Sequence, residues 1–246
     1  MDKSLYLAMS GAKQTMLAQA VHANNLANAT TTGFKADLAQ ARSMPVFGEH
    51  FPSRVYALTE NPATQFAAGA LQETNRELDI AIKGEGWIAV GNAEGQEAYT
   101  RDGSLSITPT GMLVTSSGHP VFGNSGPIVI PPAAKVEIGV DGTVSVVALG
   151  EGPSAVAEID RIKLVNPDVK NLEKGQDGLM KTRDGSVPEP DASLRVASGF
   201  LEASNVNSIA SMTEILDLAR KFEVQLKVMQ AAESADQASA QLLRIT

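Results

Sequence analysis

The sequence predicts an α+β protein in which a long helix at each terminus flanks a central antiparallel β domain. Apolar residues recur every three or four positions near both ends, which is the spacing of one face of an α-helix. Between the ends, about residues 76–200, short strand-like runs alternate with glycine-containing turns. Because no helical pattern separates these runs, an all-β sandwich or barrel is favoured over a parallel sheet.

The C-terminal helix is expected over residues 209–243. Its apolar positions advance by 3, 4, 3, 4 and 3 residues. A mean spacing near 3.5 lets two helices stay in register while they wind around each other, which predicts a coiled coil. The stripe consists of Met212, Ile215, Ala219, Phe222, Leu226 and Met229. Capping residue types precede it between Ser204 and Ser208.

The N-terminal helix is expected over residues 4–28, before a turn at Gly33. Its stripe is similar but less regular, and comprises Leu5, Met9, Ala12, Met16, Ala20, Ala23 and Leu26. Alanine fills much of this stripe, so pairing of the two terminal helices alone buries little apolar area. We therefore expect both stripes to complete their burial against neighbouring subunits.

Four segments follow from these patterns. Residues 1–33 and 204–246 form a helical assembly domain, residues 34–75 an extended connector, and residues 76–203 the β domain. Prolines and glycines break the connector, and a short strand is expected at 54–58. In the β domain, strands are expected at 78–83, 87–90, 98–100, 105–107, 112–115, 128–130, 136–140, 143–148, 159–165 and 194–201. The first of these is expected to be half-buried, because Leu78, Ile80 and Ile82 alternate with Asp79, Ala81 and Lys83. Xaa-Gly turns lie between many of them, for example at Asp102-Gly103 and Asp141-Gly142.

The composition excludes several classes of function. The net charge is −8 and no basic cluster occurs, which excludes phosphate-dominated nucleic-acid binding. The chain has no cysteine, so it forms neither disulfides nor thiolate metal sites. No apolar run approaches the ~20 residues of a membrane span, and the N-terminus lacks the pattern of a cleaved secretory signal. Direct insertion into a membrane is not expected.

No catalytic, cofactor-binding or metal-binding residue is assigned. Gly84-Glu85-Gly86 leads into a predicted strand, whereas a phosphate-binding loop leads into a helix. The three histidines lie far apart, without a second histidine at ligand spacing. A Gly-x-Ser-x-Gly elbow and a calcium-binding loop of the Asp-x-Asp-x-Asp-Gly type are both absent from the sequence.

Four stretches stand out in order along the chain: residues 24–35 (NNLANATTTGFK), 69–87, 99–104 (YTRDGS) and 199–207 (GFLEASNVN). Together they resemble the bacterial flagellar rod and hook proteins. At Trp87 the family more often carries phenylalanine. The family motif maps onto Asn25, Leu26, Ala27, Asn28, Thr32, Gly33, Phe34, Ser204, Asn205, Val206 and Asn207.

The resemblance implies a non-enzymatic subunit of the basal-body rod, exported through the flagellar type III apparatus without signal cleavage and spanning the periplasm. Its partners would be other rod subunits and copies of itself. Chain length and residues 36–46 favour the proximal rod within this family. Two alternatives are a distal-rod axial subunit and, from another class, a secreted β-domain enzyme or carbohydrate-binding module.

Overall fold

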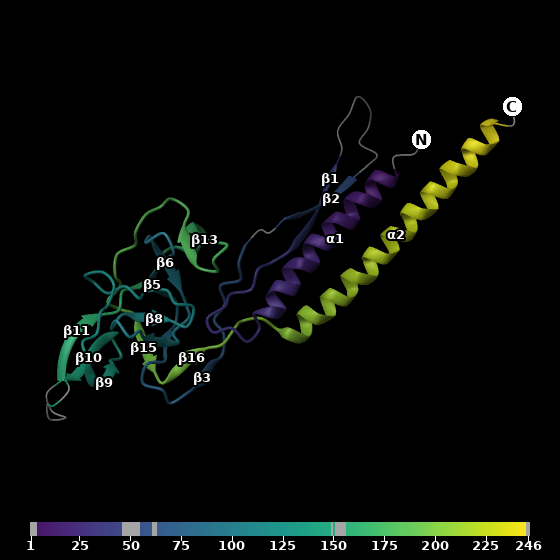
Figure 1. The fold of residues 1–246 in the computed structure, drawn as a ribbon. Helices are drawn as coiled ribbons and strands as arrows, with labels where there is room; N and C mark the ends of the chain where they lie inside the picture. Colours follow the sequence, from purple (N-terminus) through teal and green to yellow (C-terminus); the bar gives the residue numbers. More distant parts are fainter. Residues whose placement is uncertain (1–3, 46–54, 61–62, 149, 151–155, 245–246) are drawn as a thin grey trace. The chain divides into compact units, whose positions relative to one another are not determined.

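The computed structural model describes residues 4–45, 55–60, 63–148, 150 and 156–244. It confirms the α+β class, with a helix near each end and a mostly antiparallel β region between them (Figure 1). The chain forms two compact units. The helical unit contains Met1–Ala29, Asp37–Gln65 and Val206–Thr246, and the β unit contains Thr30–Ala36 and Phe66–Asn205. The chain therefore passes between the units four times.

Two long helices dominate the helical unit. Helix α1 spans Ser4–Ala27 and α2 spans Ser208–Arg244, close to the predicted ranges. Figure 1 shows them side by side and antiparallel. Asn207 begins α2, because its side-chain Oδ1 accepts a hydrogen bond from the Ala210 amide at 3.0 Å.

A β-hairpin completes the helical unit. Strand β1 (Gln40–Pro45) pairs antiparallel with β2 (Val55–Glu60), with Gln40 opposite Glu60 and Pro45 opposite Val55. Strand β2 packs along α1, where the Ser10 hydroxyl donates to the Ala57 carbonyl at 3.3 Å. The sequence pattern suggested a strand at 54–58 but did not suggest its partner strand. Of that stretch, Arg54 lies outside the described residues.

The β unit consists of several small antiparallel sheets rather than one closed barrel. Its largest sheet is open, with the order β12-β5-β6-β14-β13, and a three-stranded sheet has the order β11-β10-β9. Three further pairs are β15-β4, β16-β3 and β7-β8. The strands are β3 (Leu71–Glu73), β4 (Ile80–Lys83), β5 (Trp87–Gly91), β6 (Glu97–Thr100), β7 (Leu105–Ile107), β8 (Leu113–Thr115), β9 (Ala133–Ile138), β10 (Thr143–Ala148), β11 (Val156–Arg161), β12 (Leu164–Val165), β13 (Leu172–Lys174), β14 (Met180–Thr182), β15 (Arg195–Ser198) and β16 (Phe200–Glu202). A 3₁₀ turn, Val169–Asn171, precedes β13.

The β unit has its own hydrophobic core. The larger cluster includes Ile80, Val90, Leu105, Leu113 and Val121, all without solvent exposure. A smaller cluster surrounds the only tryptophan, Trp87, whose ring meets Phe66 edge-on with centroids 6.0 Å apart. Burial of each large aliphatic side chain contributes about 1.5–3 kcal/mol, so these clusters dominate the stability of the unit.

Three details of the predicted strands are wrong. Strand β4 was expected to be half-buried, but Ile80, Ala81 and Ile82 are all buried because both faces are covered. Of residues 128–130, only Val129 forms a β-bridge, an isolated one with Met112, so no strand forms there. Asp102-Gly103 does not close a hairpin, because β6 pairs with β5 and β14 whereas β7 pairs with β8. Thr110-Gly111 and Asp141-Gly142, in contrast, do connect paired strands.

Candidate functional site: exposed helix faces and a buried ionic cluster

The outward face of α1 carries most of the apolar stripe identified in the sequence. Leu5, Met9 and Met16 are exposed, with Met9 at 56% and Met16 at 57%. Ala20 and Ala23 are exposed as well, whereas Leu26 is half-buried and Ala12 is buried. Within one chain, most of this stripe therefore remains open to solvent.

Small residues form the inward face of α1 instead. Ala12 and Thr15 are buried, and the Thr15 hydroxyl donates to Oε1 of Gln225 on α2 at 3.3 Å. A Cβ atom at Gly11 would lie 2.9 Å from Nε2 of the same glutamine. The close approach of α1 and α2 therefore depends on small side chains at Gly11 and Ala12.

The apolar stripe of α2 is partly half-buried and partly exposed to solvent. Ile215, Ala219, Phe222 and Met229 are half-buried, whereas Met212 is 59% exposed and Leu226 is 39% exposed. Further large apolar side chains are exposed at Ile209, Leu216, Val224 and Val228. Assignment of these residues to an assembly interface remains a prediction.

The family-motif residues in the helical unit act mainly through side-chain amides. Asn25 is buried and pairs with the backbone of Asp37: its Nδ2 donates to the Asp37 carbonyl at 2.8 Å, and its Oδ1 accepts from the Asp37 amide at 2.9 Å. Asn28 donates to the Asn24 carbonyl at 3.0 Å. Ala27 is exposed at the last position of α1, and Val206 is half-buried before α2. Asn25 thus attaches the chain after the motif to the helix before it.

In the β unit, residues 30–36 lie against the segment around Arg101. The Thr32 hydroxyl donates to Oδ1 of Asp102 at 2.6 Å, and the Gly33 amide donates to the Glu202 carbonyl at 2.8 Å. Gly33 has a φ of 66°, and a Cβ there would lie 2.2 Å from the Arg101 carbonyl carbon. Only glycine fits this position, which explains in structural terms why the motif has a glycine here.

A buried ionic cluster holds this segment in place. Glu202 accepts from Lys35 Nζ at 2.6 Å through Oε1 and from Arg101 Nη1 at 2.8 Å through Oε2. The three side chains are 1%, 5% and 1% exposed for Lys35, Arg101 and Glu202. Lys35 also donates to the Ala67 carbonyl at 2.9 Å, and Arg101 donates to the Gly84 carbonyl at 2.7 Å. Two cations thus share one carboxylate in the interior of the unit.

The remaining motif residues surround this cluster. Asn205 Oδ1 accepts from the Ala36 amide at 2.8 Å, and its Nδ2 donates to the Ala67 carbonyl at 3.0 Å. Lys174 Nζ lies 3.9 Å from the centroid of the Phe34 ring and donates to the Lys35 carbonyl at 2.8 Å. Ser204 is half-buried beside Asn205. These bonds hold residues 34–36 by both side chain and backbone.

The charges of the cluster shift the titration of its members. Burial alone would raise the pKa of Glu202, but hydrogen bonds from Lys35 and the Gly69 amide, with the charges of Arg101 and Lys35, outweigh it and lower that pKa. Burial lowers the pKa of Lys35, and the hydrogen bond and charge of Glu202 offset only part of that shift. The cluster is therefore most stable when Glu202 is ionised.

Acidification is expected to weaken the β unit through Glu202. Since its folded pKa lies below the unfolded value of about 4.3, its contribution is present above that pH and is lost as pH falls through the folded pKa. The free energy of unfolding is measured with urea and Trp87 fluorescence from pH 6 to pH 3. It should fall less steeply with pH in Glu202→Gln than in the wild-type protein, and the two slopes should differ by up to about 1.4 kcal/mol per pH unit. Parallel pH profiles for the two proteins would contradict this assignment.

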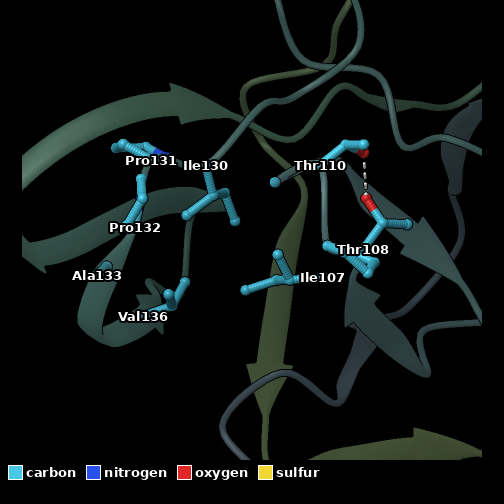
Figure 2. Close-up of a pocket in the computed structure, with 10 residues that line it drawn as sticks. Ile107, Thr108, Thr110, Ile130, Pro131, Pro132, Ala133 and Val136 are labelled. Carbon is cyan, nitrogen blue, oxygen red and sulfur yellow. Dashed lines mark hydrogen bonds between the residues drawn. The ribbon is translucent and has the colours of Figure 1, made fainter.

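A hollow elsewhere in the β unit has no comparable chemistry. Its volume is about 340 Å³, and its walls include Ile107, Ile130, Pro131, Pro132 and Val136 (Figure 2). The hydroxyls of Thr108 and Thr110, which are 2.8 Å apart, bond to each other. None of the residues that line this hollow is ionisable.

The described residues contain no group of three or more His, Asp or Glu side chains placed to hold a metal ion. His50 lies outside them. In the same described part of the chain, neither helix contains an apolar stretch suited to crossing a membrane.

Three family models match the chain in sequence order. A "Flagella basal body rod protein" model matches residues 5–35, a "Flagellar hook protein FlgE/F/G D1 domain" model matches 81–146, and a "Flagellar basal body rod FlgEFG protein C-terminal" model matches 197–242. The first includes most of α1, the second lies in the β unit, and the third includes most of α2. The fold and these matches define the class as the flagellar rod and hook proteins.

Whole-chain comparisons identify the family within this class. The chain is 42% identical to the flagellar basal-body rod protein FlgF of Escherichia coli and 39% identical to that of Salmonella typhimurium, with 100% of each chain covered. It is 29% identical to the FlgG rod protein of Buchnera aphidicola, over 98% of this chain and 100% of that one. The chain belongs to the family of flagellar basal-body rod proteins FlgF. It is a structural protein of the basal body and not an enzyme.

Proposed function

We propose that this chain is a subunit of the proximal part of the flagellar rod, where it assembles with copies of itself and with other rod subunits. The observation that carries the proposal is the apolar exposure of the helical unit. Among the side chains that the structure describes on its two helices, eleven large apolar ones are exposed: Leu5, Tyr6, Met9, Met16, Leu17, Ile209, Met212, Leu216, Val224, Leu226 and Val228. Large contiguous apolar patches on a soluble protein mark interaction surfaces.

Charge distinguishes the roles of the two helices. Between Ser4 and Ala27, α1 carries one lysine and one histidine and no acidic residue, whereas α2 carries nine acidic or basic residues. Burial of a charge without a partner is costly, so the nearly uncharged α1 suits a more deeply buried place in an assembly than α2 does. Pairing of the two helices as a coiled coil is the arrangement that the 3.5-residue spacing supports.

The same features suit a shaft that transmits torque. Long helices arranged along the axis provide many axial contacts and resist bending. The proposal includes export by the flagellar type III apparatus without signal cleavage, followed by assembly in the periplasm. Placement in the distal rod is the alternative, and the higher identity to FlgF than to FlgG relatives favours the proximal rod.

Removal of residues 1–29 is expected to leave a soluble, folded β unit that cannot enter the rod. All seven predicted interface residues of α1 are lost, while Thr32, Gly33 and Lys35 keep their partners in the β unit. Folding is measured by cooperative urea unfolding with Trp87 fluorescence. Assembly is measured by the protein content of basal bodies isolated from cells without the wild-type copy.

A matched deletion of residues 1–33 separates the two roles of the N-terminus. It also removes the bonds of Thr32 and Gly33, so the β unit should be less stable than in the first deletion while assembly is equally absent. Entry of either truncated chain into the rod would contradict the assembly role of α1.

A further inference from the structure

The ionic cluster depends on a residue that comes late in the chain. Lys35 and Arg101 precede Glu202 by 167 and 101 residues. Glu202 is the carboxylate that pairs with both cations among the described residues. Without it, two cations would face each other in the interior, where charge repulsion is poorly screened. Each cation on its own would also lack a counter-charge.

The hydrophobic clusters of the β unit contain no residue of this late segment. The buried members of both apolar clusters lie between Ile80 and Val196, before Glu202 in sequence. Residues 30–36 belong to neither cluster. They are held mainly by polar bonds, including those of Gly33 to the Glu202 backbone, Lys35 to the Glu202 carboxylate and Ala36 to Asn205.

We infer that residues 30–36 and 200–205 form a latch, which closes on the preformed β core when Glu202 docks between Lys35 and Arg101. Helix α1 ends at Ala27, three residues before the latch, and α2 begins at Ser208, three residues after it. Closure therefore anchors the chain next to both helices in one step. Until Glu202 arrives, the segment that follows α1 stays released from the β unit.

The purpose of the latch rests on the proposed function. A rod subunit exported from its N-terminus would deliver α1 long before α2. A latch that waits for Glu202 prevents the segment after α1 from being fixed before the chain that leads into α2 has emerged. The latch itself is a property of the folded monomer, so it can be tested without assembly.

Hydrogen exchange of the full-length monomer tests the latch. Three amides report closure of the latch because they donate to its residues, and they are called the latch amides. They are those of Gly33, Ala36 and Gly69, which donate to the Glu202 carbonyl, Asn205 Oδ1 and Glu202 Oε1, respectively. The amides of Ile80, Val121 and Ile128 represent the core. In the wild-type protein the latch amides should exchange at least about tenfold faster than the core amides, through a separate opening.

Charge variants establish the cause of that opening. Removal of one partner from a buried ion pair corresponds to roughly a 100-fold change or more. Glu202→Gln should therefore speed exchange of the latch amides by about that factor and leave them at least about tenfold faster than the core amides. The double variant Lys35→Met/Glu202→Gln should recover about tenfold of this loss, because a single buried cation remains. Glu97→Gln is the control. Glu97 forms an ion pair with Lys163, with Nζ and Oε1 2.8 Å apart, and neither residue belongs to the latch.

Three outcomes would overturn the latch. In the first, latch and core amides of the wild-type protein exchange at the same rate. This measurement does not depend on whether any variant folds. In the second, Glu202→Gln leaves exchange of the latch amides unchanged, so Glu202 does not close the latch. In the third, the double variant opens as readily as Glu202→Gln, so charge is not the cause. A closed latch in a monomer that still fails to enter the rod would instead count against the proposed function alone.

Discussion

Replacement of Met9 and Met16 together by glutamate is expected to abolish assembly and to leave the monomer folded. Both side chains are more than half exposed in the single chain, so the substitutions disturb little within it. In an assembly each methionine would contribute about 1.5–3 kcal/mol, and each buried carboxylate would add a further penalty. A combined loss above about 4 kcal/mol weakens assembly roughly a thousandfold.

The measurement compares incorporation into isolated basal bodies with the thermal unfolding of the purified chain. Val187→Glu serves as the matched control, because Val187 is 61% exposed but lies in the β unit. It should assemble normally. Wild-type incorporation of the double variant would show that the outward face of α1 is not an interface.

Gly103→Ala is expected to lower the free energy of unfolding of the β unit by at least about 3 kcal/mol, at the upper end of overpacking effects. A Cβ at this position would lie 1.7 Å from the Ile80 carbonyl oxygen and 2.8 Å from its carbon. Ile80 is fully buried and its amide donates to the Gly103 carbonyl at 3.0 Å, so the backbone cannot move aside without breaking the core.

Gly118→Ala provides the comparison for this substitution. Nothing lies within 4 Å of its Cβ, so it bears only the cost of its φ of 83°, about 1 kcal/mol. Urea unfolding followed by Trp87 fluorescence measures both variants. A loss in Gly103→Ala no larger than that in Gly118→Ala would contradict the close approach of the two backbones.

Local signals in the sequence were sufficient for the helices and the fold class. The apolar spacing and the capping residues near Asn207 predict α1 and α2 to within one or two residues, because both signals act over a few positions. Many strands were likewise predicted from short runs. Their pairing was not, since β4 meets β15 and β3 meets β16 across more than a hundred residues.

Orientation of α1 shows a second limit of sequence reasoning. A stripe of methionine and leucine predicts the face that meets another helix. Within the chain, however, Gly11, Ala12 and Thr15 face α2, because small residues allow the two helices to approach closely.

The ionic cluster was missed although all three of its residues lie in stretches that resemble the family. No local pattern indicates that Lys35, Arg101 and Glu202 meet, because only the folded β unit brings them together. A charged residue within an otherwise apolar or polar-uncharged motif, such as Lys35 after Gly33-Phe34, was the available signal.

The four passages of the chain between the helical unit and the β unit have a mechanical consequence. They lie at 29–30, 36–37, 65–66 and 205–206. A single covalent tether behaves as a swivel, about which one part can spin freely under load. Four parallel connections oppose rotation of one unit about a single bond and divide the load among them. A subunit built in this way is therefore expected to withstand torque.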